Sequence, residues 1–537
     1  MKRVQFIFFT SLLMVLLFGI TNYSVKADAV TDVAKHAPAL PVLVDSNEEE
    51  TITGKVGNGN AETPGEWYKG DVPPNLIPNA PVLLFVPGLN NVAQIFWENN
   101  DMYQTAFDAG YQTAFIQLYD AGGASADMWD NGALLAEKIV EISNHFGGKP
   151  ITIVAYSKGG VDTQTALTYY GAWQYVQNVI TLSSPHHGSQ LADLAYSSWS
   201  SWLADLIGAK GDGTYAMQTG NMANFRSVID QEPKAYYNDY YTLGGTSWGS
   251  VFSSTWYGGV YLSQYGSNDG VVTTASSRLP GGEQLAIGEW THSTIRTGLT
   301  FPVFEGALID PQPNAVYKKR EAKDDSNARP LSNQWIRGGK LTEGIDERIT
   351  MAVEDNVNNV TMRVLSATPI SSVTLLSPNG KVVEPALKHS ILEEGVYQGA
   401  YQYTISIDEP KSGEWELTLS SEDKNGYLLV ANFHSAQKLV ESESTKNKIT
   451  NSNTWNYWLH ANNVVLEEKS LQATYRITKS GQPDTMQTFT KKGTTDLSKE
   501  LPVKEKGSVY NITIDVEGKT KQGKPFNRTI IDSIYVE

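Results

Sequence analysis

Residues 151–160 constrain the fold of this 537-residue chain most strongly, because a short apolar run leads directly into a tight turn with a serine at its centre. The run 151–155 is typical of a buried strand, and the pattern from Gly159 to Tyr170 is typical of a helix. Small residues at Ala155 and Gly159 are needed where a strand turns this sharply into a helix. Such a turn is strained and projects the serine hydroxyl above the sheet. We therefore predict that Ser157 is a nucleophile; an ordinary strand–helix turn with a capping serine is the alternative.

Short apolar runs alternate with helical patterns from about residue 64 to residue 300, which favours a parallel sheet covered by helices. The expected strands are 81–86, 112–118, 151–155, 176–182, 240–243 and 284–287, and the main expected helices are 131–145 and 159–170. Residues 188–235 interrupt this rhythm with short amphipathic stretches rich in Trp, Ser, Ala and Leu. We expect one α/β domain over residues 28–308, in which 188–235 is either a packed covering layer or a lid-like cap.

A serine hydroxyl is a poor nucleophile without a base. Where the serine stands in a strand–turn–helix segment of this kind, the order along the chain is the serine, then the acid, then the histidine. His292 follows the last expected strand and is the expected base, with a surface histidine at a helix start as the alternative. His186 and His187 follow the strand directly after Ser157, which is too early in the chain for the base.

The acid must lie between the serine and the base, after a late strand. Asp269, in the turn Asn268-Asp269-Gly270, fits this position best and would orient the imidazole. Because Asn-Asp-Gly is also an ordinary turn sequence, Asp239 is kept as a first alternative and Asp230 as a second.

Two backbone N–H groups are needed to hold the negative oxygen that forms when a hydroxyl attacks a carbonyl carbon. One is expected from Lys158, directly after the serine, and the other from Leu89, in the loop after strand 81–86. The side chain of Lys158 also places a charge beside the turn, and the sequence offers no explanation for it.

These residues together resemble the α/β-hydrolase lipases, in particular the bacterial lipases and esterases, over about residues 64 to 300. The motifs that carry the resemblance are Phe85-Val86-Pro87-Gly88, Ala155-Tyr156-Ser157-Lys158-Gly159, Ser184-Pro185-His186-His187-Gly188-Ser189, and Asn268-Asp269-Gly270-Val271-Val272 with the later His292-Ser293. Pro87 stands where those families often have histidine, but backbone groups form the oxyanion hole, so the chemistry need not change. The resemblance implies an α/β-hydrolase fold and a Ser-His-Asp triad that hydrolyses carboxylic esters through an acyl-enzyme, without a cofactor.

In the related lipases, the segment that holds His186 and His187 is mostly architectural, so these two histidines are expected to be structural. Some of those lipases bind calcium through aspartates, but no loop here has a spacing such as that of the EF-hand, and we expect no metal. The apolar, Trp-rich insertion favours an acyl chain as the substrate group, and hence a lipase over an acetyl esterase.

The composition changes near residue 310, where several prolines and charged runs indicate a linker over 309–339. Beyond it, period-2 patterns predict all-β sandwich modules at 340–442 and, with an Ig-like style, at 450–537. These modules could contact a cell surface or the substrate surface, or act as spacers. Trp455, Tyr457 and Trp458 could form such a binding face, although a buried sandwich core is the more common place for these residues.

Residues 1–27 have the positive start, the apolar stretch and the small residues before a cut that mark a secretory signal peptide, with a retained anchor as the alternative. A secreted, extracellular protein is therefore expected. The net charge of −16 disfavours nucleic acid as a partner, and the absence of cysteine excludes disulfides and a cysteine nucleophile.

Two other functions remain open at this stage. The chain could be an extracellular depolymerase of polyesters that uses its β modules to grip an insoluble polymer. It could also be a surface-binding protein with an inert hydrolase domain, although such a protein would be expected to lack one or more of the three proposed residues. The expected partner in the preferred interpretation is an acyl ester, either a lipid or a polyester.

Overall fold

The computed structural model describes residues 37–44, 62–122, 125–250, 253–309, 332–385, 389–436, 438–443, 448–450 and 452–537. The expected signal peptide, residues 1–27, and the larger part of the expected linker, residues 310–331, lie outside the described residues. Residues Pro38–Glu537 form one compact unit.

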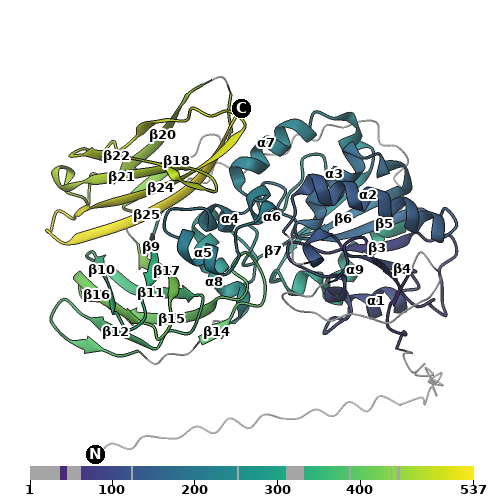
Figure 1. The fold of residues 1–537 in the computed structure, drawn as a ribbon, viewed down its shortest axis with the longest axis horizontal. Helices are drawn as coiled ribbons and strands as arrows, with labels where there is room; N and C mark the ends of the chain where they lie inside the picture. The colour runs from purple at the N-terminus through teal and green to yellow at the C-terminus, as the bar shows by residue number, and fades with distance from the viewer. Residues whose placement is uncertain are drawn as a thin grey trace, which may run out of the picture. The chain divides into compact units, whose positions relative to one another are not determined.

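The first part of this unit is built on an eight-stranded sheet (Figure 1). Its strands, in spatial order, are β1 (Val42–Leu43), β2 (Trp67–Lys69), β4 (Thr113–Ile116), β3 (Val82–Val86), β5 (Ile151–Tyr156), β6 (Val176–Leu182), β7 (Asp239–Gly245) and β8 (Glu283–Gly288). The strands from β4 to β8 run parallel, and β1 and β2 add an antiparallel edge. Each of the six strands expected from the sequence is present, within two residues of its expected bounds at either end.

Helices cover both faces of this sheet because its strands are apolar on both sides. The helix α2 (Met128–His145) packs on the face formed by Val82, Leu84 and Val86 of β3, and α3 (Gly159–Tyr169) lies beside α2 (Figure 1). On the opposite face, Leu83 and Phe85 pack against α1 (Met102–Asp108), α9 (Phe301–Phe304) and α10 (Gly306–Ile309). The α/β-hydrolase fold class is thereby confirmed.

Residues 188–235 form the expected run of short helices. These are α4 (Gln190–Ala195), α5 (Ser201–Leu206), α6 (Asp212–Ala216) and α7 (Thr219–Ile229). Of these, α4 and α5, together with α8 (Ser254–Leu262), share one apolar core with the C-terminal strands, in which Leu191 and Leu203 pack in the same cluster as Ile336 and Leu428. The helices α6 and α7 pack in another cluster, with Met128 of α2 and Val161 of α3. The insertion is therefore a packed layer between the sheet and the β modules.

The first β module is a sandwich of a four-stranded and a five-stranded antiparallel sheet with one shared core. Its strands are β9 (Gln334–Leu341), β10 (Glu347–Val353), β11 (Val357–Ser366), β12 (Ser372–Leu376), β13 (Val382–Val383), β14 (His389–Ile391), β15 (Tyr401–Asp408), β16 (Gly413–Ser420) and β17 (Asn425–Ser435). Its first strand begins at Gln334, inside the residues expected to be linker, because Trp335 and Ile336 are buried in the cores on its two faces.

The second β module pairs a three-stranded with a five-stranded sheet around another shared core. Its strands are β18 (Val440–Glu443), β19 (Lys448–Ile449), β20 (Thr454–Ala461), β21 (Gln472–Lys479), β22 (Gln482–Lys492), β23 (Lys499–Pro502), β24 (Ser508–Lys519) and β25 (Pro525–Val536). Trp455 and Tyr457 are buried in that core, so these two aromatic side chains do not form a surface binding face.

None of the helices in the described part of the chain combines the length and the hydropathy that a membrane span requires.

The contact between α7 and β25 is close enough to depend on a glycine. A Cβ atom on Gly220 would lie 2.8 Å from backbone atoms of Ile534, and backbone cannot yield as a flexible side chain can. We expect Gly220→Ala to lower the free energy of unfolding by about 1–3 kcal/mol in urea titrations, because the added methyl overpacks this junction. The matched control is Gly306→Ala, whose Cβ would meet no atom within 4 Å, and it should leave stability unchanged or raised. Equal stability of the two variants would contradict this account of the junction.

Candidate active site

Ser157 occupies the strained turn that the sequence predicts. It follows the last residue of β5 and precedes α3, and its φ of 53° lies in the left-handed region that L-residues rarely adopt. The amide of Ser157 donates to the carbonyl of Leu182 at 2.9 Å, which ties the turn to the end of β6. The hydroxyl thus sits at the carboxyl edge of the parallel strands, where ligands bind in open α/β sheets.

Two glycines allow the chain to pack around this turn. A Cβ on Gly88 would lie 2.7 Å from the Ser157 Cβ, and a Cβ on Gly159 would overlap the carbonyl oxygen of Pro87. The loop that follows β3 therefore presses directly against the turn after β5. This contact explains why the residue two positions after the serine is glycine, since any side chain there would separate the two segments.

The structure brings Ser157, His292 and Asp269 into one hydrogen-bonded chain, although 135 positions of sequence separate the serine from the histidine. The Nε2 atom of His292 lies 3.0 Å from the Ser157 Oγ, and its Nδ1 atom lies 2.7 Å from an Asp269 carboxylate oxygen. All three side chains are buried. With Nδ1–H donating to the carboxylate, Nε2 is the nitrogen that accepts from the serine hydroxyl.

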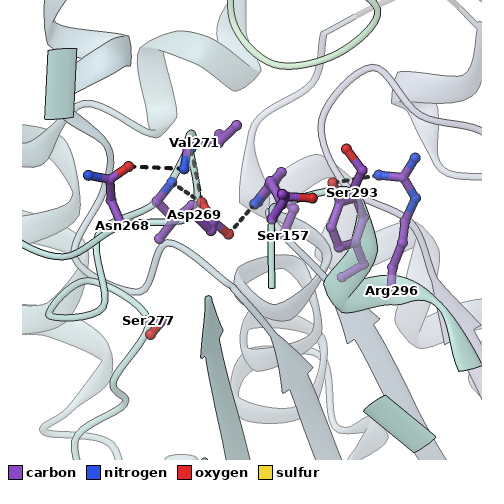
Figure 2. A network of polar contacts seen from close by, with 12 residues as sticks. Ser157, Asn268, Asp269, Val271, Ser277, Ser293 and Arg296 are labelled. Carbon is purple, nitrogen blue, oxygen red and sulfur yellow. Dashed lines mark hydrogen bonds and ion pairs between the residues drawn. The ribbon is translucent and has the colours of Figure 1, made fainter. Parts of the chain in front are cut away.

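A fixed turn holds the carboxylate of Asp269. Its Oδ1 accepts from the amides of Val271 at 2.9 Å and Val272 at 2.8 Å, which leaves Oδ2 for His292. Asn268 accepts from the amide of Gly270 at 3.0 Å, and Gly270 has a φ of 98°, which favours glycine. Figure 2 shows this turn beside Ser157, with Ser293 and Arg296 on the other side of the serine in this view.

The two alternative acids lie elsewhere. Asp239 is exposed at the start of β7, and Asp230 forms an ion pair with Arg226 at 3.4 Å. The carboxylate that contacts the His292 ring in the described residues is that of Asp269. The geometry therefore favours Asp269 among the three acids that the sequence left open.

The two expected oxyanion residues flank the serine. Lys158 directly follows it, and Leu89 lies in the loop whose Gly88 packs against Ser157; both line one cavity with Ser157 and His292. Among the turn and loop hydrogen bonds of the described residues, none uses the amide of Leu89 or of Lys158. Both donors are thus available for a ligand atom in the cavity.

The charge on Lys158, for which the sequence offers no reason, is explained by two partners. Its side chain is fully buried, and its Nζ atom lies 3.0 Å from both carboxylate oxygens of Asp162 and 3.4 Å from one oxygen of Asp120. Burial acts to lower the pKa of Lys158, but the two carboxylates outweigh it and raise that pKa. Burial also raises the pKa of Asp162, against the opposing attraction of Lys158.

His186 and His187 take no part in the hydrogen-bonded chain of Ser157. His186 is buried with its Nε2 atom 3.4 Å from the Thr181 hydroxyl, and burial lowers its pKa well below the ordinary value, so the ring is neutral. His187 is exposed. The described residues hold no group of three or more His, Cys, Asp or Glu side chains arranged to bind a metal ion.

One part of the site could not be expected from the sequence. The segment Glu394-Gly395-Val396, between β14 and β15 of the first β module, lines the same cavity as Ser157. The Glu394 carboxylate accepts from Arg296 Nη1 at 2.8 Å, from the Tyr156 hydroxyl at 3.4 Å, and from the Ser293 hydroxyl. Burial raises the pKa of Tyr156 well above its ordinary value, so the phenol keeps its proton and can donate.

Comparison with known proteins supports the fold. A Bacillus licheniformis lipase, BlEst2 in its propeptide form, is 36% identical, with a TM-score of 0.72 over 88% of this chain and 98% of that chain. The same enzyme in its mature form is 46% identical over 46% of this chain and 100% of that chain, with a TM-score of 0.44. Triacylglycerol lipase 2 of Saccharomyces cerevisiae is 27% identical over 149 residues, and this chain spans 46% of its length.

No family model matches the chain. The likeness to the Bacillus enzyme nevertheless extends over nearly the whole of both proteins at an identity that indicates common descent. This protein therefore belongs to the α/β-hydrolase lipase family that the Bacillus licheniformis enzyme represents.

Proposed function

We propose that this protein is a secreted carboxylic ester hydrolase, a lipase or esterase, in which Ser157, His292 and Asp269 act as a catalytic triad. The observation that carries the proposal is the unbroken chain of two hydrogen bonds, 3.0 and 2.7 Å long, from hydroxyl to imidazole to carboxylate. Both relatives described above are named lipases, and one of them a triacylglycerol lipase. The proposed secretion rests on the signal-like residues 1–27.

The proposed reaction has two half-steps. His292 removes the proton of Ser157 as the serine oxygen attacks the ester carbonyl, and the amides of Leu89 and Lys158 hold the negative oxygen. The carbonyl re-forms, and the alcohol leaves with the proton from His292. A water molecule then repeats the sequence on the acyl-enzyme, which releases the acid and restores the serine. Asp269 orients the imidazole throughout and stabilises its protonated form.

The lining of the cavity favours an acyl chain as the substrate group. Apart from the polar residues at its centre, the wall is formed by apolar side chains from four segments: Leu89, Pro185, Met217, Val271 and Val272. Met217 comes from the insertion 188–235, so the insertion supplies part of the wall that would contact an acyl chain. A lipid ester and a polyester with short repeats could both contact this apolar wall, so the lining does not separate a lipase from a polyester depolymerase. Binding of the protein to polymer granules would distinguish the depolymerase.

We further propose that the first β module covers the site in this form of the chain. Glu394 is anchored to Arg296, and the neighbouring Gly395 and Val396 take up cavity wall that an ester would otherwise contact. The similar Bacillus structure is itself that of a propeptide form, which supports a precursor state for this chain as well. In this proposal the first β module covers the cavity, and this role replaces the spacer or surface-binding role considered for it from the sequence.

Ser157→Ala should abolish turnover of p-nitrophenyl acetate, by about 10⁴-fold or more, because the nucleophile is lost. The variant should unfold at the same urea concentration as the parent, since alanine leaves the backbone and the packing in place. Full activity of Ser157→Ala on this small ester would refute the proposed function. Low activity of both proteins on larger esters is expected, since the site is covered.

Asp269→Asn tests which carboxylate supports His292. An amide cannot take the carboxylate's role without changing the tautomer of the imidazole, so kcat should fall about 10³–10⁴-fold. The matched control is Asp239→Asn, an exposed aspartate at the start of β7, which should keep kcat within about twofold. A larger loss in the control than in Asp269→Asn would contradict the assignment of the acid.

Glu394→Ala tests the cover in the full chain. Loss of the anchor should raise kcat/KM for p-nitrophenyl octanoate by about tenfold, the factor that corresponds to ~1.4 kcal/mol of lost contact. The neighbouring Glu393 is exposed, so Glu393→Ala is the matched control and should change nothing. Unchanged or reduced turnover of the long ester in Glu394→Ala, relative to Glu393→Ala, would contradict the proposed cover.

A further inference from the structure

Asp120 is a buried carboxylate for which the proposed triad has no use. It lies in the 3₁₀ turn Tyr119–Gly122 that follows β4, and it is 3% exposed. Its Oδ2 accepts from the Asn131 amide at 2.5 Å and pairs with Lys158 Nζ at 3.4 Å. Its Oδ1 accepts from the backbone amide of Asn90 at 3.2 Å. One side chain thus contacts both segments that carry the proposed oxyanion amides.

On the side of the β3 loop, the bond from Asp120 fixes the peptide next to the Leu89 donor. The peptide between Leu89 and Asn90 donates its N–H to Asp120, and its carbonyl accepts from the Asn91 side chain at 2.8 Å. Asn90 has a φ of 54°, a conformation that costs energy and needs support from its surroundings. With this peptide held on both sides, the preceding amide of Leu89 cannot rotate freely.

On the side of the turn, the bond reaches Lys158, whose own backbone amide is the second proposed donor. The Lys158 side chain is fully buried and runs down from the turn to Asp162, one helical turn along α3, and to Asp120. Because an uncompensated buried ammonium is costly, Lys158 is held where both carboxylates can reach it. The backbone of Lys158, which carries the second proposed donor amide, is fixed together with this side chain.

A direct electrostatic role for the ammonium explains these contacts less well. Two carboxylates surround one ammonium, and Asn131 donates to both of them, at 2.5 Å to Asp120 and at 3.0 Å to Asp162. The charge of Lys158 is therefore compensated inside the cluster and provides little positive potential at the cavity. What the cluster provides is a fixed distance between two chain segments.

We propose that Asp120 is a positioning residue that holds the backbone amides of Leu89 and Lys158 at the separation that an oxyanion requires. This inference rests on the proposed function, since the oxyanion exists only if Ser157 attacks a carbonyl. Asp120 itself does not touch the reacting atoms. Its effect is carried by Asn90 and Lys158, so it should change the stability of the transition state and leave the binding of the ester in its ground state alone.

The test is Asp120→Asn in the full chain. An amide oxygen can still accept from Asn90, but its nitrogen cannot pair with the ammonium, so the link between the segments is weakened. We expect kcat for p-nitrophenyl acetate to fall about 10–100-fold with KM within about threefold. Butylboronic acid, which forms a tetrahedral adduct on a reactive serine, should bind more weakly by a factor close to the loss in kcat.

The matched control is Asp162→Asn, which removes the other carboxylate of Lys158 but leaves the contact between Asp120 and Asn90 in place. It should lower kcat less than Asp120→Asn does. If Asp120→Asn does not fold, Asn131→Ala replaces it, since this change keeps both carboxylates but removes the amide that holds Asp120. For Asn131→Ala we expect a smaller fall in kcat than the one predicted for Asp120→Asn, again with KM unchanged.

Three results would overturn the proposal: an unchanged kcat in Asp120→Asn, or in Asn131→Ala where that variant replaces it; an equal loss in the Asp162→Asn control; or a loss of kcat without any loss of boronate affinity. Each of these would leave the triad intact. In these assays the proposed function itself fails if Ser157→Ala stays active, so the two failures can be told apart.

Discussion

The left-handed backbone at Ser157 is the constraint on which the rest of the site depends. A residue with a side chain keeps this strained conformation only where the surrounding structure stabilises it. Here, segments packed closely on both sides of the turn do so. Gly88 presses on the serine from the loop after β3, and Gly159 lets the carbonyls of that loop approach the start of α3. A hydroxyl is thereby held clear of the sheet in one position, to which an acid and a base can be fitted.

The groups around that hydroxyl come from separate loops at the same edge of the sheet. Asp269 stands in the region between β7 and β8, and His292 follows β8, so neighbouring parallel strands deliver them to one place. Each is fixed by backbone bonds: two amides hold the Asp269 carboxylate, and the amide of His292 donates to the Asp269 carbonyl at 2.9 Å. The main chain therefore sets the positions of Asp269 and His292, and their side chains have little freedom to move.

The sequence predicted the sheet, the two β modules and the three side chains of the hydrogen-bonded chain, because each has a local signal: an apolar run, a glycine-flanked serine, a turn, and an order along the chain. It could not predict contacts without such a signal. Glu394 and Arg296 are 98 positions apart, and nothing near either residue indicates the other. The charge of Lys158 has no explanation in the sequence, because its partner Asp120 is 38 positions away. For Trp455, by contrast, the sequence favours a buried sandwich core over a surface face, and the structure places the side chain in that core.

The most direct test of the central claim is to find which residue an activated phosphonate ester modifies. The full chain would be treated with a small fluorophosphonate, digested, and mapped by mass spectrometry. Activated hydroxyls react with such reagents far faster than ordinary serines, so the account predicts a single adduct, on Ser157. Hydrolysis of esters by a protein that carries no adduct there, or a dominant adduct on another residue, would contradict it.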